Sequence, residues 1–333
     1  MSGYGERNYD PQFRPVRGIY ASRLQQFIDR GGDFPDLNLP KFYDVERISL
    51  DQKHVKIWWH QIEFKHGSSP VSPDKRPSWK EVIEQDQKGK LDFKEARKSQ
   101  PFGPSWSTTW FKVELTVPSK WLNSREQLIF EWNCNNERVV IDPETLLPIT
   151  AFSGGERSEY LLPPSKNGKY FFYIEAGNNG MFGCGQGSII NPPDDNRYFH
   201  LDKADLVLPD WEARGLRIDY WMLTDASREL PDDSWQKQRA RQIANEVMDM
   251  FDYNDRSSVI ACRKFIQKEY FDEFSDSSDV YSKGDVNQLS SVYGMGNCHI
   301  DTAWLWPFAE TRRKIVRSWA SQCTLMDEFP EYQ

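Results

Sequence analysis

Residues 107–117 read STTWFKVELTV, and this stretch decides the fold class of the middle of the chain. Apolar and polar residues alternate along it, with many β-branched and aromatic side chains, until Pro118 ends the run. Residues two apart lie on the same face of a strand, so this pattern gives one apolar face and one polar face. It predicts a half-buried β-strand that ends before Pro118.

Four later stretches repeat this pattern, at 127–132, 137–141, 146–152 and 170–176. Turn-forming residues separate them, such as Ser-Gly-Gly at 153–155 and Asn-Asn-Gly at 178–180. Short strands at this spacing are typical of an antiparallel sandwich. We therefore predict a β-sandwich over 102–224, in which the last alternating stretch is 216–223.

The regions on either side of this sandwich favour helices. Residues 1–101 mix turn formers with short amphipathic stretches, which predicts an N-terminal arm with helices at 22–30 and 79–86. Residues 225–288 predict a helical connector and linker: Ser234 offers an N-cap, and apolar residues then recur every three or four positions. A second helix of the connector is expected at 258–271.

Residues 289–333 indicate the start of a further domain. The apolar run that begins at 291 suits a strand buried on both faces of a parallel sheet, and it ends in the polar pair His299 and Asp301. A helix should follow, with Glu310 paired to Lys314 and an apolar face that includes Trp319. The predicted fold class is therefore a multidomain α+β chain that ends in the first βα unit of an α/β domain.

Composition excludes some classes of partner. The chain has 333 residues with 42 basic and 50 acidic side chains, a formal charge of -8, which argues against binding nucleic acid. No stretch is apolar enough to span a bilayer, and the start has no apolar segment behind a basic flank, so neither membrane nor secretory signal is expected. The five cysteines contain no C-x-x-C pair, which favours a reducing compartment such as the cytoplasm.

His299 and Asp301 are the candidate metal ligands. In α/β enzymes functional residues gather at the carboxyl ends of strands, and two residues separated by one position point to the same side. An imidazole nitrogen and a carboxylate oxygen are both zinc donors, so this pair could meet one cation. A hydrogen-bonded structural pair is the alternative. His54, His60 and His66 match no metal motif and are expected to be ordinary surface or packing histidines.

Three longer stretches carry a resemblance to a known family. Residues 296–307 read GNCHIDTAWLWP and are followed by Ala309-Glu310-Thr311; residues 102–111 read FGPSWSTTWF, and residues 173–183 read YIEAGNNGMFG. Together they resemble the N-terminal part of the zinc-dependent α-mannosidases of glycoside hydrolase family 38, in particular the cytosolic and fungal vacuolar branch. The resemblance covers roughly residues 40–333.

The resemblance implies a retaining, zinc-assisted hydrolysis of terminal α-D-mannosyl residues in mannosides and oligosaccharides. His299 and Asp301 would be the first two zinc ligands and Trp304 the aromatic residue that contacts the sugar, whereas Trp306 is expected to pack. The nucleophile and the acid/base would follow Gln333 in an α/β-barrel catalytic domain, so the 333-residue chain alone is expected to be inactive. Mannose-containing oligosaccharides, homo-oligomers and a cytoplasmic location, with delivery to the vacuole in fungi, are further expectations.

Two other functions stay open. His-x-Asp pairs at strand ends also serve amide hydrolysis, so another zinc-dependent hydrolase such as a deacetylase is one alternative. The other is a non-catalytic module, in which the sandwich and its helices bind glycans or partner subunits. Continuation of the chain into a strand that carries a catalytic Asp would favour the glycosidase.

Overall fold

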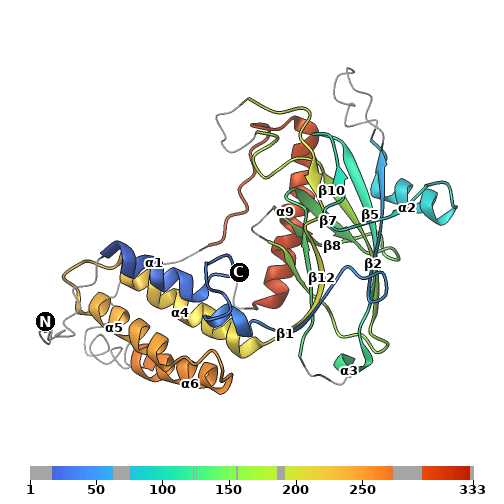
Figure 1. Ribbon diagram of the computed structural model, residues 1–333. Coiled ribbons are helices and arrows are strands. Elements are labelled where there is room, and N and C mark those ends of the chain that lie inside the picture. The colour runs from blue at the N-terminus through green and yellow to red at the C-terminus, as the bar shows by residue number, and fades with distance from the viewer. Residues whose placement is uncertain are drawn as a thin grey trace, which may run out of the picture. The chain divides into compact units, whose positions relative to one another are not determined.

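The computed structural model describes residues 17–62, 76–122, 124, 126–154, 157–185, 192–272 and 295–330 (Figure 1). The chain folds into two compact units, each built from two separate stretches. The first unit joins residues 1–45 to 209–291, and the second joins residues 46–208 to 292–333. These limits differ from the predicted ones at 101/102, 224/225 and 288/289, because contacts distant in sequence decide which segments pack together.

The second unit is built on antiparallel β-sheets, as predicted. The four-stranded sheet has the order β1 (Asp44–Ser49), β12 (Lys203–Pro209), β6 (Ile129–Asn133) and β9 (Glu159–Leu161). The six-stranded sheet has the order β3 (Lys94–Glu95), β2 (Val55–Ile62), β5 (Thr108–Thr116), β10 (Lys169–Gly177), β7 (Glu137–Ile141) and β8 (Pro148–Phe152). A small third sheet pairs β11 (Phe199–His200) with β4 (Pro101–Phe102). The five strands predicted from 107 to 176 are thereby confirmed.

The six-stranded sheet is covered on both faces. Its inner face shares a core with the four-stranded sheet, where the rings of Phe111, Phe130 and Trp132 are fully buried. Its outer face lies beneath α2 (Trp79–Gln87) and α9 (Phe308–Glu328), where Trp110 and Tyr173 are buried (Figure 1). Because both faces are covered, every residue of β7 is buried.

The predicted N-terminal arm is wrong for residues 44–62. β1 and β2 belong to the sheets, and β2 pairs with β5 in register from Val55 opposite Leu115 to Ile62 opposite Thr108. Most side chains of β2 are partly exposed, and they do not alternate between buried and exposed as in a strand with one solvent face. This segment forms a strand because it pairs with β5, about 50 residues later in the chain, and local periodicity does not reveal such a distant partner.

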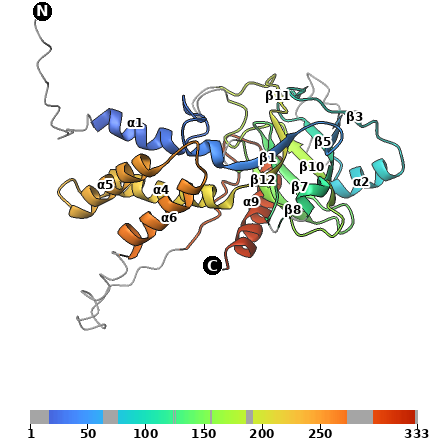
Figure 2. The ribbon, with the colours of Figure 1, turned by 60° about the horizontal axis from the view of Figure 1, so that its bottom comes forward.

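The first unit consists of helices that lie side by side (Figures 1 and 2). They are α1 (Arg17–Ile28), α4 (Trp211–Glu229), α5 (Trp235–Met250) and α6 (Ser257–Ile266), with a 3₁₀ turn at Leu39–Phe42 and a π-helical turn at Gln267–Asp272. The predicted N-cap is confirmed, since Ser234 accepts a hydrogen bond from the backbone of Lys237. No helix within the described ranges is both long and apolar enough to cross a bilayer.

The predicted strand at 216–223 is wrong, because these residues form the middle of α4. Leu216, Ile218, Tyr220 and Met222 do alternate, but they also fit a helix. Leu216 and Tyr220, four residues apart, are fully buried, whereas Ile218 and Met222 are about half exposed. Asp210 caps the helix by accepting a hydrogen bond from the backbone of Ala213, so the helical period prevails over the period of two.

The C-terminal helix is confirmed, but not its predicted faces. The buried side of α9 carries Glu310, Thr311, Lys314 and Arg317, while Trp319 is 60% exposed. Residues 295–300 have no regular secondary structure, and residues 291–294 lie outside the described residues. A parallel strand needs hydrogen bonds from a neighbouring strand, and the described residues offer none to this segment. The α/β-barrel unit therefore stays a prediction.

Candidate functional site

The two predicted metal ligands lie next to each other before α9. Nε2 of His299 is 3.3 Å from Oδ1 of Asp301, and the two side chains are 72% and 41% exposed. Two donors of a tetrahedral zinc ion with bonds of about 2.0–2.2 Å lie roughly 3.4 Å apart, so this separation fits half of such a site. It fits a hydrogen-bonded pair equally well. Across the described stretches, no three His, Cys, Asp or Glu side chains are grouped as a metal site.

The two tryptophans of the loop have different surroundings. Trp304 is 51% exposed, and its ring meets the rings of Phe182 and Trp306 edge-on, at centroid distances of 6.0 and 5.7 Å. Trp306 is buried, and its Nε1 donates a hydrogen bond of 3.1 Å to Oγ1 of Thr311. Trp306 therefore packs, as predicted, while Trp304 keeps an exposed ring that a sugar could contact.

A buried cluster of charged residues fixes the start of α9 on the six-stranded sheet. Oε1 of Glu310 lies 2.5 Å from Nη1 of Arg317, and its Oε2 lies 3.1 Å from Nη1 of Arg313. Glu137, on β7, accepts hydrogen bonds from Nζ of Lys314 at 2.6 Å and from Arg317 at 3.1 Å. The predicted pair of Glu310 with Lys314 is thus wrong, since Lys314 turns toward the sheet.

Electrostatics keep this cluster charged. Burial alone would raise the pKa of Glu310, but the guanidinium groups of Arg313, Arg317 and Arg76 outweigh it and hold the pKa far below the usual range. Burial lowers the pKa of Lys314, which the Glu137 carboxylate opposes. A carboxyl group held ionised in this way cannot donate a proton near neutral pH, so Glu310 is unsuited to act as a general acid. Its carboxylate pairs with Arg313 and Arg317 of the same helix and lies 3.5 Å from Nη1 of Arg76.

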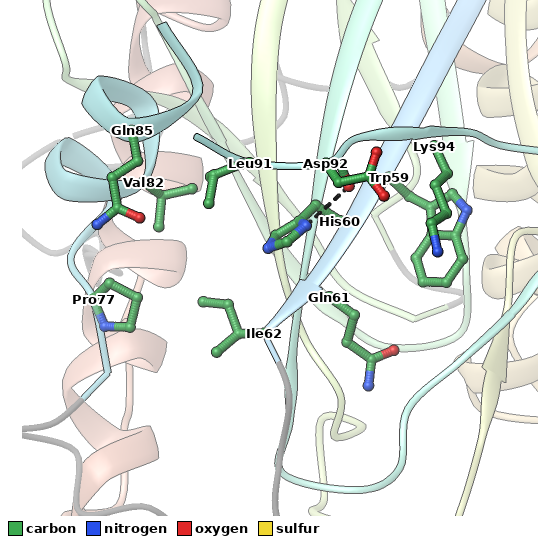
Figure 3. A pocket seen from close by; sticks show the side chains of 10 residues that line it. All are labelled: Trp59, His60, Gln61, Ile62, Pro77, Val82, Gln85, Leu91, Asp92 and Lys94. Atoms are coloured by element: carbon green, nitrogen blue, oxygen red, sulfur yellow. Dashed lines mark hydrogen bonds between the residues drawn. The ribbon is translucent and has the colours of Figure 1, made fainter. Parts of the chain in front are cut away.

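A separate cavity of about 590 Å³ lies between α2 and β2. Figure 3 shows Val82 and Gln85 of α2 on one side and Trp59, His60 and Ile62 of β2 on the other. Leu91, Asp92 and Lys94 also line it, so the wall combines apolar surface with charged and amide groups. Its volume lies in the range of small-molecule pockets, about 300–1,000 Å³. It contains none of the residues predicted from sequence to form a site.

His54 and His60 each contact a backbone carbonyl oxygen. Nδ1 of His54 lies 2.9 Å from the carbonyl oxygen of Thr116, and Nδ1 of His60 lies 3.1 Å from that of Asp92. His66 lies outside the described residues. All five cysteines are free, and three of them are buried: Cys134, Cys184 and Cys262.

Sequence reasoning missed the charged cluster because its members come from distant segments. Glu137 and Lys314 are 177 positions apart, and each is one charged residue in a chain that is 28% charged. One local signal was available: Glu310, Lys314 and Arg317 recur at helical spacing on the face of α9 that proves to be buried.

Comparisons with known proteins assign two parts of the chain. Residues 60–207 match the α-mannosidase jelly roll domain, and residues 290–333 match the N-terminal domain of the glycosyl hydrolases of family 38. The second match contains His299, Asp301 and Trp304.

Curated relatives agree with this assignment. An α-mannosidase of Saccharomyces cerevisiae is 70% identical over 98% of this chain, and α-mannosidase G of Dictyostelium discoideum is 34% identical over 77%. The chain covers 30% and 22% of the length of these two proteins. A β-glucuronidase of Ruminococcus gnavus aligns with 50% of this chain and 31% of its own, at 11% identity and a TM-score of 0.29, which is too distant to support an argument.

Proposed function

Because this chain corresponds to the N-terminal part of a family 38 α-mannosidase, we propose that it serves the retaining hydrolysis of terminal α-D-mannosyl residues in mannosides and oligosaccharides. The observation that carries this proposal is the family 38 match over 290–333. It names glycosyl hydrolases, and this favours a glycosidase over an amide hydrolase such as a deacetylase.

Within that reaction, His299 and Asp301 would hold zinc as two of its ligands. The donor atoms suit zinc, and their separation of 3.3 Å suits adjacent positions around one ion. Bound zinc would supply a Lewis acid that holds the hydroxyl groups of the sugar. Trp304 would contact the apolar face of the same sugar, since its ring is half exposed three positions after Asp301.

The remaining zinc ligands and both catalytic carboxyl groups would come from the part of the full-length relatives that this chain does not cover. We propose a cytoplasmic protein that forms homo-oligomers and, in a fungus, is delivered to the vacuole. These three points rest on the family resemblance.

The metal assignment is tested in a polypeptide of the relatives' full length that carries this sequence. His299→Ala and Asp301→Ala should each remove bound zinc and nearly abolish hydrolysis of an aryl α-mannoside, because each change removes one ligand. Trp304→Ala should keep the zinc and lose about 1–3 kcal/mol of transition-state stabilisation. His54→Ala is the matched control, since its Nδ1 contacts the carbonyl oxygen of Thr116 and it lines no candidate site, and it should keep both zinc and activity.

Zinc content, measured by mass spectrometry, shows whether lost turnover accompanies lost metal, and Tm shows whether the variant still folds. If His299→Ala keeps its zinc and its turnover, the pair is structural and this loop lies outside the catalytic centre. The 333-residue chain alone should bind zinc weakly and cleave no mannoside, because two ligands form a weak site. Stoichiometric, tight zinc binding by that chain would contradict this.

The cavity beside α2 favours a second candidate function, a glycan-binding module. The cavity is lined by an indole, an imidazole, two amides, a carboxylate and an ammonium group. Such a mixture could contact both the apolar face and the hydroxyl groups of a sugar. Titration of the 333-residue chain with mannose, followed by NMR, tests it. Shifts at millimolar sugar that vanish in Trp59→Ala would support the module, and an unchanged spectrum would exclude it.

A further inference from the structure

The turn that follows β10 packs against the loop that carries His299, Asp301 and Trp304. This turn, residues 177–183 with Gly177 as the last residue of β10, belongs to the matched jelly roll region, whereas the loop belongs to the region matched by the catalytic family. We propose that the turn forms part of the catalytic centre and that Phe182 at its tip is a second aromatic contact for the mannosyl ring, beside Trp304. This proposal rests on the proposed glycosidase function and adds a residue to that same site.

The turn is held rigidly by buried amides. Asn178 and Asn179 have no exposed surface. Nδ2 of Asn178 donates to the hydroxyls of Ser107 and Thr109 at 2.7 and 3.0 Å, and Nδ2 of Asn179 donates to Oε2 of Glu137 at 2.9 Å. Backbone hydrogen bonds between Gly180 and Gly183 close the turn, at 2.7 and 3.1 Å. Phe182 is therefore presented from a fixed backbone.

Two glycines of the turn leave room for the loop and for α9. Gly183 has φ of +77°, and a Cβ there would collide with the carbonyl oxygen of Leu305. A Cβ on Gly177 would collide with the guanidinium of Arg317. Nζ of Lys314 also donates a hydrogen bond of 3.0 Å to the carbonyl of Met181. Turn, loop and helix thus form one closely packed assembly.

Phe182 lies at the exposed edge of this assembly. Its side chain is 51% exposed, the same fraction as that of Trp304, and the two rings meet at an interplanar angle of 86°. A single half-exposed ring is common on a protein surface, but here two such rings, Phe182 and Trp304, lie against each other next to the predicted ligands. The rings of Phe182 and Trp304 thus form one exposed aromatic surface. His299 and Asp301 precede Trp304 by only a few residues. An α-mannosyl ring held at the metal could contact both rings.

The test uses a polypeptide of the relatives' full length that carries this sequence. Phe182→Ala should lower kcat/KM for an aryl α-mannoside by about 3- to 10-fold, mainly through KM, with unchanged zinc content. Phe182→Tyr should restore most of the lost kcat/KM, because it keeps the ring. The control is Phe171→Ala on β10, where the ring is 42% exposed and meets Tyr173 edge-on at 5.3 Å. It should match the wild type in kcat/KM.

The outcomes separate this proposal from the function on which it rests. An active wild type in which Phe182→Ala and Phe171→Ala have equal kcat/KM would overturn the role of Phe182 alone. A wild-type enzyme that cleaves no α-mannoside would overturn the proposed function and this contact with it. A loss in Phe182→Ala that Phe182→Tyr does not restore, together with a lower Tm, would assign the ring to packing and overturn the proposal.

Discussion

Removing the charge of Glu310 tests whether the buried cluster holds α9 on the sandwich. Glu310→Gln keeps the shape of the side chain, which is 1% exposed, but removes one of two carboxylates from each guanidinium, so that Arg313 keeps only Glu175 and Arg317 only Glu137. Removing one partner of a buried ion pair lowers the free energy of unfolding by about 3–5 kcal/mol. For a unit of this size each kcal/mol lowers Tm by roughly 2–4 °C, so we expect a fall of about 6–20 °C.

The assay is thermal unfolding of the 333-residue chain, followed by near-ultraviolet circular dichroism. Glu84→Gln is the matched control, because Glu84 forms an exposed pair with Lys88 at 3.7 Å on α2 of the same unit. An exposed pair at this spacing contributes at most about 0.5 kcal/mol, so the Tm of the control should barely change. If Glu310→Gln unfolds within about 2 °C of the control, the cluster does not hold α9, and our reasoning is refuted.

Acid should remove the same stabilisation from the wild type. The pKa of Glu310 is lower in the folded chain than its ordinary value of 4.5, because the neighbouring guanidinium groups outweigh the effect of burial. Such a carboxyl stabilises the fold fully above its ordinary pKa and loses this contribution as the pH falls toward its folded pKa. The difference in Tm between wild type and Glu310→Gln should therefore be constant above about pH 5.5 and shrink below about pH 4.5. A constant difference down to about pH 3 would contradict this assignment.

Three further predictions follow from burial and backbone geometry. In urea unfolding, Gly183→Ala should destabilise the chain more than Gly89→Ala does. Both glycines have positive φ, but only Gly183 lacks space for a Cβ. If the two variants lose the same free energy of unfolding, about 1 kcal/mol each, the loop is not closely packed against Gly183. In the native chain a thiol reagent should modify only Cys298 and Cys323 rapidly, and the other three thiols should react after unfolding, as a colorimetric count would show. Asp210→Asn should keep the N-cap hydrogen bond but lose the carboxylate that accepts two hydrogen bonds of 2.7 Å from Arg256. The free energy of unfolding of the helical unit should therefore fall by about 1–3 kcal/mol. An unchanged midpoint of urea unfolding would refute this.

The sequence determined those elements whose interactions are local, between residues close together in the chain. The alternation of 107–117 predicted β5, and later stretches predicted β6, β7, β8 and β10, because a strand with a clear pattern of side chains carries its own period. The helix capped by Ser234 was equally visible. Residues 216–223 fitted two periods at once, and only the packing of Leu216 and Tyr220 in the helical core decided between them.

For the candidate site, too, the sequence determined some features and the tertiary structure determined others. The sequence determined which residues of the 296–307 loop carry donor atoms and an aromatic ring, because those properties belong to the side chains themselves. Tertiary structure alone placed Phe182 beside Trp304, and it alone brought Glu137 to Lys314 across 177 positions. The physical reason is that burial and charge pairing are properties of a three-dimensional neighbourhood. A charged residue reads as solvent-facing in a sequence until a distant segment covers it.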